Sequence, residues 1–577
     1  MATEAPVSDR PADRPVTPGT AAHHPVVHHP VVRRTERVVV AIVTAAFAIV
    51  LFTWAAVVPM YQAADERAHF DAVVHVAIGD GWPDPGDLHL LRAVDEADTA
   101  PPSATMGQLL DETGRAETDT VDQMTQHPPT YYAVAAGVLH LVDFAARTPD
   151  QALLAVRLLG ALLLAPLPAL AWATVRRVTR SPRAALVGAF AVVAVPELAS
   201  IGASASNDAP VVLFSATTVW LATRVLTGDR RVRTSVALAV SLGVAILFKG
   251  TALPLIPFVA VALLLAGGPA VRFGARLVRT VGVLAGAAVI GAWWWLRNLL
   301  VFHTLQPSGF ESIRPPKPFP AGTGPDPFRF ADVSWSTIAR TFWGSFGGRA
   351  QWILSPVVFE TATVLALGAI LVWAFRREPG LRVAVALASL PAAVLVFQTA
   401  NAWGSYSATT VVGATQGRYY FPALVAFIAL SAIAWRRALT TDTGRRRATV
   451  VVSALGAALG CYALVFVYGS FAERSRVRVT PAGLDVLAAS SPVPVPVLVS
   501  AWCAAVLLLA VAVVLAYGRV ARRPRTEDDA VERDTTPAHA HERDTTPAHA
   551  HERDTTPAPA DDPVLPDSTD VRSEHAG

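Results

Sequence analysis

"RVVVAIVTAAFAIVLFTWAAVVPM", residues 37–60, is followed directly by "YQAADERAHF", residues 61–70. The first stretch exceeds the roughly 20 apolar residues that a helix needs to cross a bilayer. The second places two neighbouring carboxylates, Asp65 and Glu66, just beyond the end of that span. A membrane helix with acidic chemistry at its outer end is therefore the first prediction.

Similar apolar runs recur along all 577 residues, of which 53% are hydrophobic and 16% charged. The pattern predicts an all-α polytopic membrane protein of about twelve transmembrane helices. The predicted spans are residues 37–60, 153–175, 184–201, 210–226, 236–248, 251–267, 281–301, 357–375, 383–397, 421–435, 448–468 and 495–517.

Arginine clusters predict the orientation, because cytoplasmic loops carry an excess of Lys and Arg. Such clusters lie near residues 33–37, 176–183, 228–233, 271–279, 376–382, 436–447 and 518–525. Placing them all in the cytoplasm puts both termini there. A weaker apolar segment at 128–146 must then lie in the outer interface or dip in and return. The basic "RSRVR" after Glu473 would be external, against the trend.

The domain organisation follows from these spans. Residues 1–35 are predicted to be a disordered cytoplasmic tail, 36–518 the membrane domain, and 519–577 a second disordered tail with decapeptide repeats. External loops are expected at 61–127 and 302–356.

Cys461 and Cys503 lie in apolar runs, which argues against a disulfide framework. The formal net charge of +3 with position-sorted arginines gives no reason to expect nucleic acid.

The first external loop carries the acidic candidates. Asp65 and His69 share a helix face, while Glu66 points elsewhere. A partly desolvated carboxylate there can act as a general base or hold a cation. A solvated helix start is an equally good explanation. Asn207 and Asp208, in "SASNDAP", could simply cap the next helix.

The cationic candidates are Lys249, Arg297 and Arg418. Arginine is well suited to binding phosphate in a low-dielectric site, although an interfacial arginine can simply reach toward water. Lys249 lies between two apolar runs, where a charge indicates a functional site or an internal ion pair. No nucleotide-binding or zinc-ligand motif accompanies these residues.

The motifs "ADERAHF", "HPPTYYAVAA", "SASNDAP", "WLRNLLVFHTLQPSG", "FWGSFGG" and "QGRYYFPAL" occur in this order between about residues 37 and 517. This order resembles a family of bacterial integral membrane proteins of unassigned function related to the GT-C glycosyltransferases, which use polyprenyl-phosphate sugars. The composition, rich in Ala, Val and Arg, is typical of a GC-rich bacterium such as an actinobacterium. The expected location is the bacterial plasma membrane.

The resemblance implies an extracytoplasmic active site in which Asp65 or Glu66 activates an acceptor. It also implies a second acidic position in a later external loop, which fits Asp208. Our own interpretation adds His69 and Asn207 as support for the acceptor or a metal, and Lys249, Arg297 and Arg418 as ligands of the donor phosphate; of these, Arg297 and Arg418 match arginine positions in the family's pattern. A divalent cation, Mg²⁺ or Mn²⁺, is compatible with Asp65, Glu66 and Asp208. The predicted reaction is inverting transfer of a sugar from a polyprenyl-phosphate donor to a cell-envelope polysaccharide, lipid or protein.

Two other classes stay open at this stage. A transporter or flippase of lipid-linked sugars would also place charges along a membrane path, and the break in "KGTALPLIP" favours it. A non-catalytic scaffold of envelope assembly would keep the same helices.

Overall fold

The computed structural model describes residues 30–520 except 269–270, 308, 310–314, 347–350, 377–379, 474 and 476. Residues 1–29 and 521–577, which hold most of both predicted tails, lie outside this range. The first helix begins at Pro30, inside the stretch predicted to be a tail.

Each predicted span is helical. Among the described residues, nine helices or helix pairs are long and apolar enough to cross a membrane, and a bent pair, α8 with α9, makes a tenth. The spans are formed by α1 (Pro30–Val57), α6 (Pro149–Leu164) with α7 (Leu167–Thr179), α8 (Pro182–Val193) with α9 (Pro196–Gly202), α10 (Asp208–Leu226), α13 (Phe273–Phe302), α15 (Pro356–Ala369) with η5 (Ile370–Ala374), α16 (Leu381–Thr409), η6 (Gly417–Ala423) with α17 (Leu424–Ala438), α18 (Asp442–Tyr468) with η7 (Gly469–Glu473), and α20 (Val495–Leu515) with η8 (Ala516–Val520).

Two of the twelve predicted spans are shorter. They are α11 (Val232–Ile246), with 15 residues, and η3 (Gly250–Ala252) with α12 (Leu255–Leu265). At 1.5 Å per residue, α11 covers only about 22 Å of a hydrocarbon core roughly 30 Å thick. Lys249 lies at the break between them. The all-helical polytopic architecture is thus confirmed.

The weak segment at 128–146 forms α5 (Thr130–Leu141) and η2 (Phe144–Ala146). With 12 residues, α5 is about 18 Å long, so it is too short to cross a bilayer as a straight helix.

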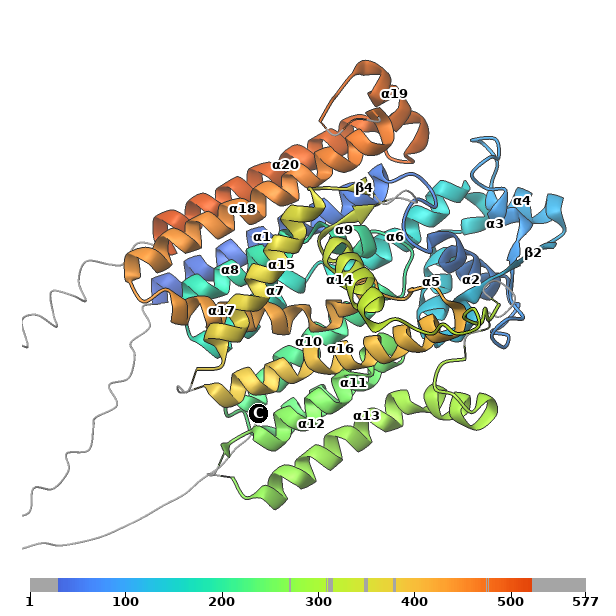
Figure 1. Ribbon diagram of the computed structural model, residues 1–577. Coiled ribbons are helices and arrows are strands. Elements are labelled where there is room, and N and C mark those ends of the chain that lie inside the picture. The colour runs from blue at the N-terminus through green and yellow to red at the C-terminus, as the bar shows by residue number, and fades with distance from the viewer. Residues whose placement is uncertain are drawn as a thin grey trace, which may run out of the picture. The chain divides into compact units, whose positions relative to one another are not determined.

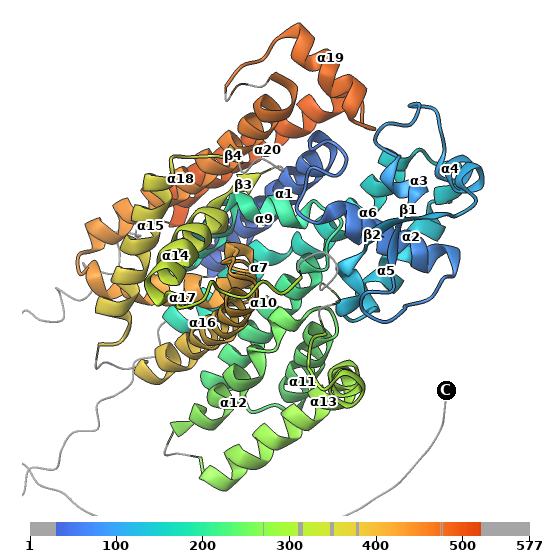
Figure 2. The ribbon, with the colours of Figure 1, turned by 45° about the vertical axis from the view of Figure 1, so that its right-hand side comes forward.

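The small elements between α1 and α6 gather at one end of the bundle, as Figures 1 and 2 show. They pair β1 (His89–Leu91) with β2 (Glu117–Val121) in an antiparallel sheet, and α2 packs on α5. The helical elements here are α2 (Glu66–Ile78), α3 (Arg92–Asp95), α4 (Met106–Thr113), η1 (Gln123–Gln126), α5 and η2.

Other outer elements are α14 (Pro327–Trp343), the hairpin β3 (Ser345–Phe346) with β4 (Gln351–Trp352), and α19 (Pro481–Ser490). Proline in the first turn of α14, α15, α19 and α20 suits a position whose N–H has no helical partner.

The apolar core centres on α10 and the η6–α17 span, which are the most buried of the long helices, whereas α13 is the most exposed. An exposed apolar helix of this length is typical of a lipid-facing position. Both central spans begin at the end of the bundle where the small elements gather, so their first residues are close to α2.

Candidate functional site

The Asp65 carboxylate does not cap α2 but binds an arginine from a distant part of the chain. Asp65 precedes α2 in the left-handed region, at φ 57°, and makes no side-chain capping bond. Instead, Arg418 Nη2 donates to Asp65 Oδ2 at 2.5 Å, across 353 positions of sequence. The Asp65 side chain stays 41% exposed while that of Arg418 is only 4% exposed. A non-glycine residue at positive φ is uncommon and is often found at functional sites.

Arg418 connects Asp65 to a buried ion pair. Lys249 Nζ donates to Asp208 Oδ1 at 2.8 Å, and Arg418 Nη1 lies 3.8 Å from Asp208 Oδ2. The Lys249 and Asp208 side chains are 9% and 7% exposed. Asp65, Arg418, Asp208 and Lys249 therefore form a chain of alternating charges, hereafter the charge array. Pairing makes such buried charges tolerable in a low-dielectric interior.

Several polar atoms near the charge array are buried without a hydrogen-bond partner among the described residues. They are Arg418 Nε, Asp208 Oδ2, Asn207 Oδ1 and His127 Nδ1. Since buried polar atoms nearly always have partners, such a group indicates a place for a polar ligand or for water. Arg418 Nε is an N–H donor that makes no hydrogen bond within the described residues.

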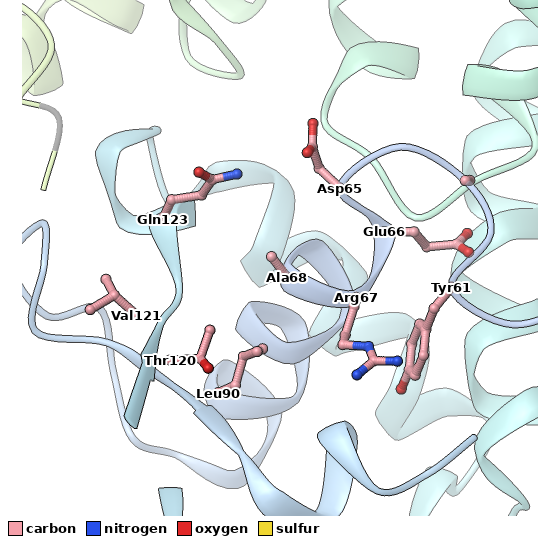
Figure 3. A pocket seen from close by; sticks show the side chains of 10 residues that line it. Tyr61, Asp65, Glu66, Arg67, Ala68, Leu90, Thr120, Val121 and Gln123 are labelled. Carbon is pink, nitrogen blue, oxygen red and sulfur yellow. The ribbon is translucent and has the colours of Figure 1, made fainter. Parts of the chain in front are cut away.

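The neighbouring carboxylates Asp65 and Glu66 bind different arginines. Both Glu66 oxygens accept from Arg157, at 2.8 Å from Nε and 2.6 Å from Nη2, and Ala205 N donates to Oε1 at 3.1 Å. The charge of Glu66 is therefore compensated by Arg157, and Figure 3 shows its side chain pointing away from that of Asp65. Its contacts fix α2 against the segment that leads into Asn207 and Asp208.

The sequence analysis did not identify Arg157. Besides Glu66, its guanidinium binds the carbonyl oxygens of Ala55, Val58 and Pro59, at 2.8, 2.6 and 2.9 Å, where α1 ends. A signal was present, because an arginine within the apolar run "ALLAVRLLGALLL" needs a partner in the membrane.

His69 lies next to the charge array in its neutral form. Its Nδ1 is 3.0 Å from the Tyr132 hydroxyl, and its ring stacks on that of Tyr132. Burial, aided by the charge of Lys249, lowers the pKa of His69 to about 3. His69 thus supplies shape and a neutral hydrogen-bonding nitrogen, not charge, at physiological pH.

Asn207 lies directly before Asp208 and donates to the Phe248 carbonyl at 3.4 Å, beside Lys249. Its side chain does not cap α10. Arg297 has other partners: Asp84 at 2.7 Å, and the rings of Trp294 and Phe302. With a side chain 37% exposed, it resembles an interfacial arginine, and no contact joins it to the charge array within the described residues.

A cavity of about 280 Å³ opens beside Asp65 (Figure 3). It is lined by Tyr61, Ala63, Asp65, Glu66, Arg67, Ala68, Leu90, Thr120, Val121 and Gln123. The exposed base candidate therefore faces a space that a small group can enter.

The position of Arg418 depends on a close approach of two backbones at Gly417. A Cβ at 417 would overlap the backbone nitrogen of Phe342 in α14, and Gly417 N donates to Thr341 Oγ1 at 2.6 Å.

We expect Gly417→Ala to push η6 away from α14 and to lower the free energy of unfolding by about 1–3 kcal/mol. It should also slow any reaction that uses Arg418. Thermal unfolding and turnover are the measurements. Gly413→Ala, where nothing lies within 4 Å, should leave both unchanged; equal effects of the two substitutions would refute this role.

A second pair of carboxylates lies buried inside the first loop. Asp71 Oδ1 accepts from Leu91 N at 2.9 Å and Asp122 Oδ1 from Met124 N at 2.8 Å. Asp71 Oδ2 lies 3.5 Å from His75 Nε2, and Asp122 Oδ2 lacks a hydrogen-bond partner among the described residues. Burial raises the pKa of Asp122 to about 7, and burial together with the neighbouring Asp122 raises that of Asp71. The folded loop therefore holds protons that the unfolded chain releases near pH 4.

Stability should fall as the pH rises from about 4 through 7, since the folded state binds more protons than the unfolded state there. Asp122→Asn removes the loss of stability that deprotonation of Asp122 causes. The apparent melting temperature of this variant should therefore exceed that of the wild type by a few degrees at pH 8 and should depend less on pH. Melting curves from pH 5 to 8 test this, with the exposed Asp111→Asn as a control. Parallel pH dependences in wild type and Asp122→Asn would contradict the assignment.

The charge array does not fit a resident divalent cation. Its two carboxylates are already compensated by Arg418 and Lys249, and Glu66 is compensated by Arg157. Within the described ranges, no group of three or more His, Cys, Asp and Glu side chains could hold a metal ion. Hard divalent cations require several uncompensated oxygen ligands.

Comparison with known proteins gives a partial family match. Residues 126–295 match the family described as dolichyl-phosphate-mannose-protein mannosyltransferase. The matched region runs from the end of η1 into α13 and contains Asn207, Asp208 and Lys249. The resemblance to glycosyltransferases that use polyprenyl-phosphate sugars is thereby confirmed for this region. No curated protein matches the sequence.

Two solved structures illustrate the distant structural similarity. ArnT from Cupriavidus metallidurans bound to undecaprenyl phosphate is 15% identical, over 83% of this chain and 77% of that chain, with a TM-score of 0.43. The Archaeoglobus fulgidus oligosaccharyltransferase tethered with an acceptor peptide is 11% identical, over 78% of this chain and 59% of that chain, with a TM-score of 0.39.

Proposed function

We propose that this protein is a membrane glycosyltransferase that moves a sugar from a polyprenyl-phosphate donor to a cell-envelope acceptor on the extracytoplasmic side. One observation carries the proposal: an exposed carboxylate, Asp65, is paired with a buried arginine, Arg418, whose Nε is unpartnered among the described residues. This arrangement places a proton acceptor next to an anion-binding donor. The family match over residues 126–295 supports the same class of reaction.

The proposed chemistry is a single displacement with inversion. An acceptor hydroxyl attacks the anomeric carbon as the bond from that carbon to the phosphate oxygen breaks. Asp65 accepts the hydroxyl proton, and the polyprenyl phosphate leaves with its negative charge stabilised by Arg418 and Lys249. Asp208 holds both cations in place. Glu66 acts through Arg157 as a positioning residue, and Asn207 and His69 shape the site.

We infer the orientation from the arginine clusters, because those within the described residues flank the ends of the spans opposite Asp65. In this orientation the described ends, Pro30 and Val520, are cytoplasmic, and the loops at 61–127 and 302–356 are outside. We assign Arg297 to the interface, where its pair with Asp84 fixes the first loop against α13.

The test is transfer from a panel of radiolabelled polyprenyl-phosphate sugars by purified protein in sealed liposomes. Label should appear in an acceptor while polyprenyl phosphate accumulates, and the new glycosidic bond should have the inverted configuration.

The short helices α11 and α12 around Lys249 favour a transporter as the second candidate. Intact donor that becomes accessible across the bilayer would establish that candidate and reject ours.

A further inference from the structure

The cavity beside Asp65 has the dimensions of a site for one small group. At about 280 Å³ it is just smaller than the clefts of roughly 300 Å³ and above that enclose drug-sized ligands. The space is open on one side, so its volume sets no upper limit on a ligand that extends into solvent, and one sugar ring or a short polyol fits within it.

The cavity is lined by both apolar and hydrogen-bonding side chains. Ala68, Leu90 and Val121 supply the apolar surface, and in Figure 3 Asp65 and Gln123 lie at one end of it. The Gln123 amide has no hydrogen-bond partner within the part of the chain that the structure describes, and the Thr120 side chain is exposed. A sugar ring offers the matching surface, with C–H groups on its faces and hydroxyls at its edge. An amide can both donate to and accept from such hydroxyls.

The charges of the cavity disfavour an anionic acceptor. Arg67 is the cation that lines it, but its Nη1 and Nη2 are bound to Asp95 at 2.7 Å and Asp98 at 2.9 Å. Its guanidinium also lies 4.8 Å above the Tyr61 ring. Arg418 and Lys249, which would compensate the donor phosphate, do not line this cavity, so the charge of Asp65 would repel a phosphate or carboxylate that entered it.

A peptide acceptor is disfavoured by the adjacent strand. An extended peptide could add to the edge of β2, but that strand is only five residues long and carries Glu117 and Asp119. Short, charged edge strands are a common way to prevent such pairing.

We propose that this cavity is the acceptor subsite and that it selects a neutral sugar or polyol, with Gln123 and Thr120 determining the specificity. The inference rests on the proposed function and extends it to the acceptor. It makes the acceptor a glycan or glycolipid headgroup whose reactive hydroxyl lies against Asp65.

The experiment uses the full-length protein in liposomes with its radiolabelled donor and three probe acceptors: octyl glucoside, octyl glucuronide and a Ser/Thr peptide. Transfer to octyl glucoside should dominate. Gln123→Leu should raise its KM about five- to ten-fold, as expected for a lost hydrogen bond, without changing the KM for the donor. Gln62→Leu, an exposed glutamine of the same loop outside the cavity, is the matched control.

A second variant tests the charge argument. Asp95→Asn with Asp98→Asn releases Arg67, so transfer to octyl glucuronide should rise relative to octyl glucoside. Transfer mainly to the peptide or the glucuronide by wild type, or an unchanged KM in Gln123→Leu, would overturn the acceptor assignment while leaving the transferase intact. If wild type consumes no donor with any probe, the proposed function fails, and this inference fails with it.

Discussion

Asp65→Asn is expected to lower the rate of sugar transfer about 1,000-fold, within the range usual for loss of a general base. The substitution keeps the size of the side chain and can still accept a hydrogen bond from Arg418. It removes the ability to take the acceptor proton. Binding of the donor should change little, because Arg418 and Lys249 remain, so the loss should appear in kcat. Single-turnover transfer measured with saturating donor tests this directly.

The pH profile gives a second readout of the same residue. Burial opposes ionisation of Asp65, but the charge and hydrogen bond of Arg418 outweigh it and lower the pKa of Asp65. A lowered pKa keeps the carboxylate ionised, so wild-type activity should persist on acidification through the range in which an ordinary aspartate protonates. Asp111→Asn, in the same loop but distant from the cavity lining, should retain full activity. An Asp65→Asn variant that folds and transfers sugar at a normal rate would eliminate the base role.

The largest expected effect on stability comes from Arg157→Leu. The substitution leaves the Glu66 carboxylate buried without its counter-ion and removes donors from three carbonyl oxygens at the end of α1. Breaking one partner of a buried ion pair typically costs about 3–5 kcal/mol. We therefore expect poor yield and a strongly lowered melting temperature in detergent. Arg147→Leu, an exposed arginine with one carbonyl contact, should behave like wild type.

A double variant distinguishes the effect of the unpaired charge on stability from the effect of losing the arginine side chain. Adding Glu66→Gln to Arg157→Leu removes the uncompensated charge, so part of the lost stability should return. Glu66→Gln alone should keep the hydrogen bond from Ala205 and lose less than Arg157→Leu. If Arg157→Leu melts within two degrees or so of wild type, the contact does not hold α1, α2 and the segment before α10 together.

The membrane architecture could be predicted because each span needs only length and hydropathy, which are local properties. The segments at 236–248 and 251–267, predicted as spans, are each short of a full crossing, and the structure has correspondingly short helices there. The number of full crossings depends on how such helices pack, which no local pattern determines.

The members of the charge array could be suggested as unusual charges at span ends, but their pairing could not. Asp65 and Arg418 are 353 positions apart, and Glu66 and Arg157 are 91 apart. Asp65 and Glu66 look equivalent in sequence. In the structure, Asp65 has left-handed backbone angles and its carboxylate binds Arg418, whereas Glu66 is the first residue of α2 and binds Arg157. Arg297 resembled Arg418 in its surroundings, and only the fold distinguishes its pairing with Asp84.

The central claim is that the charge array binds the phosphate of the donor beside Asp65. The most direct measurement is an experimental structure of the protein in lipid with a bound polyprenyl phosphate. The account predicts phosphate oxygens within about 3.2 Å of Arg418 Nε and Lys249 Nζ, with the Asp65 carboxylate facing the position of the sugar. A phosphate bound elsewhere, with Arg418 Nε still unpartnered, would contradict it.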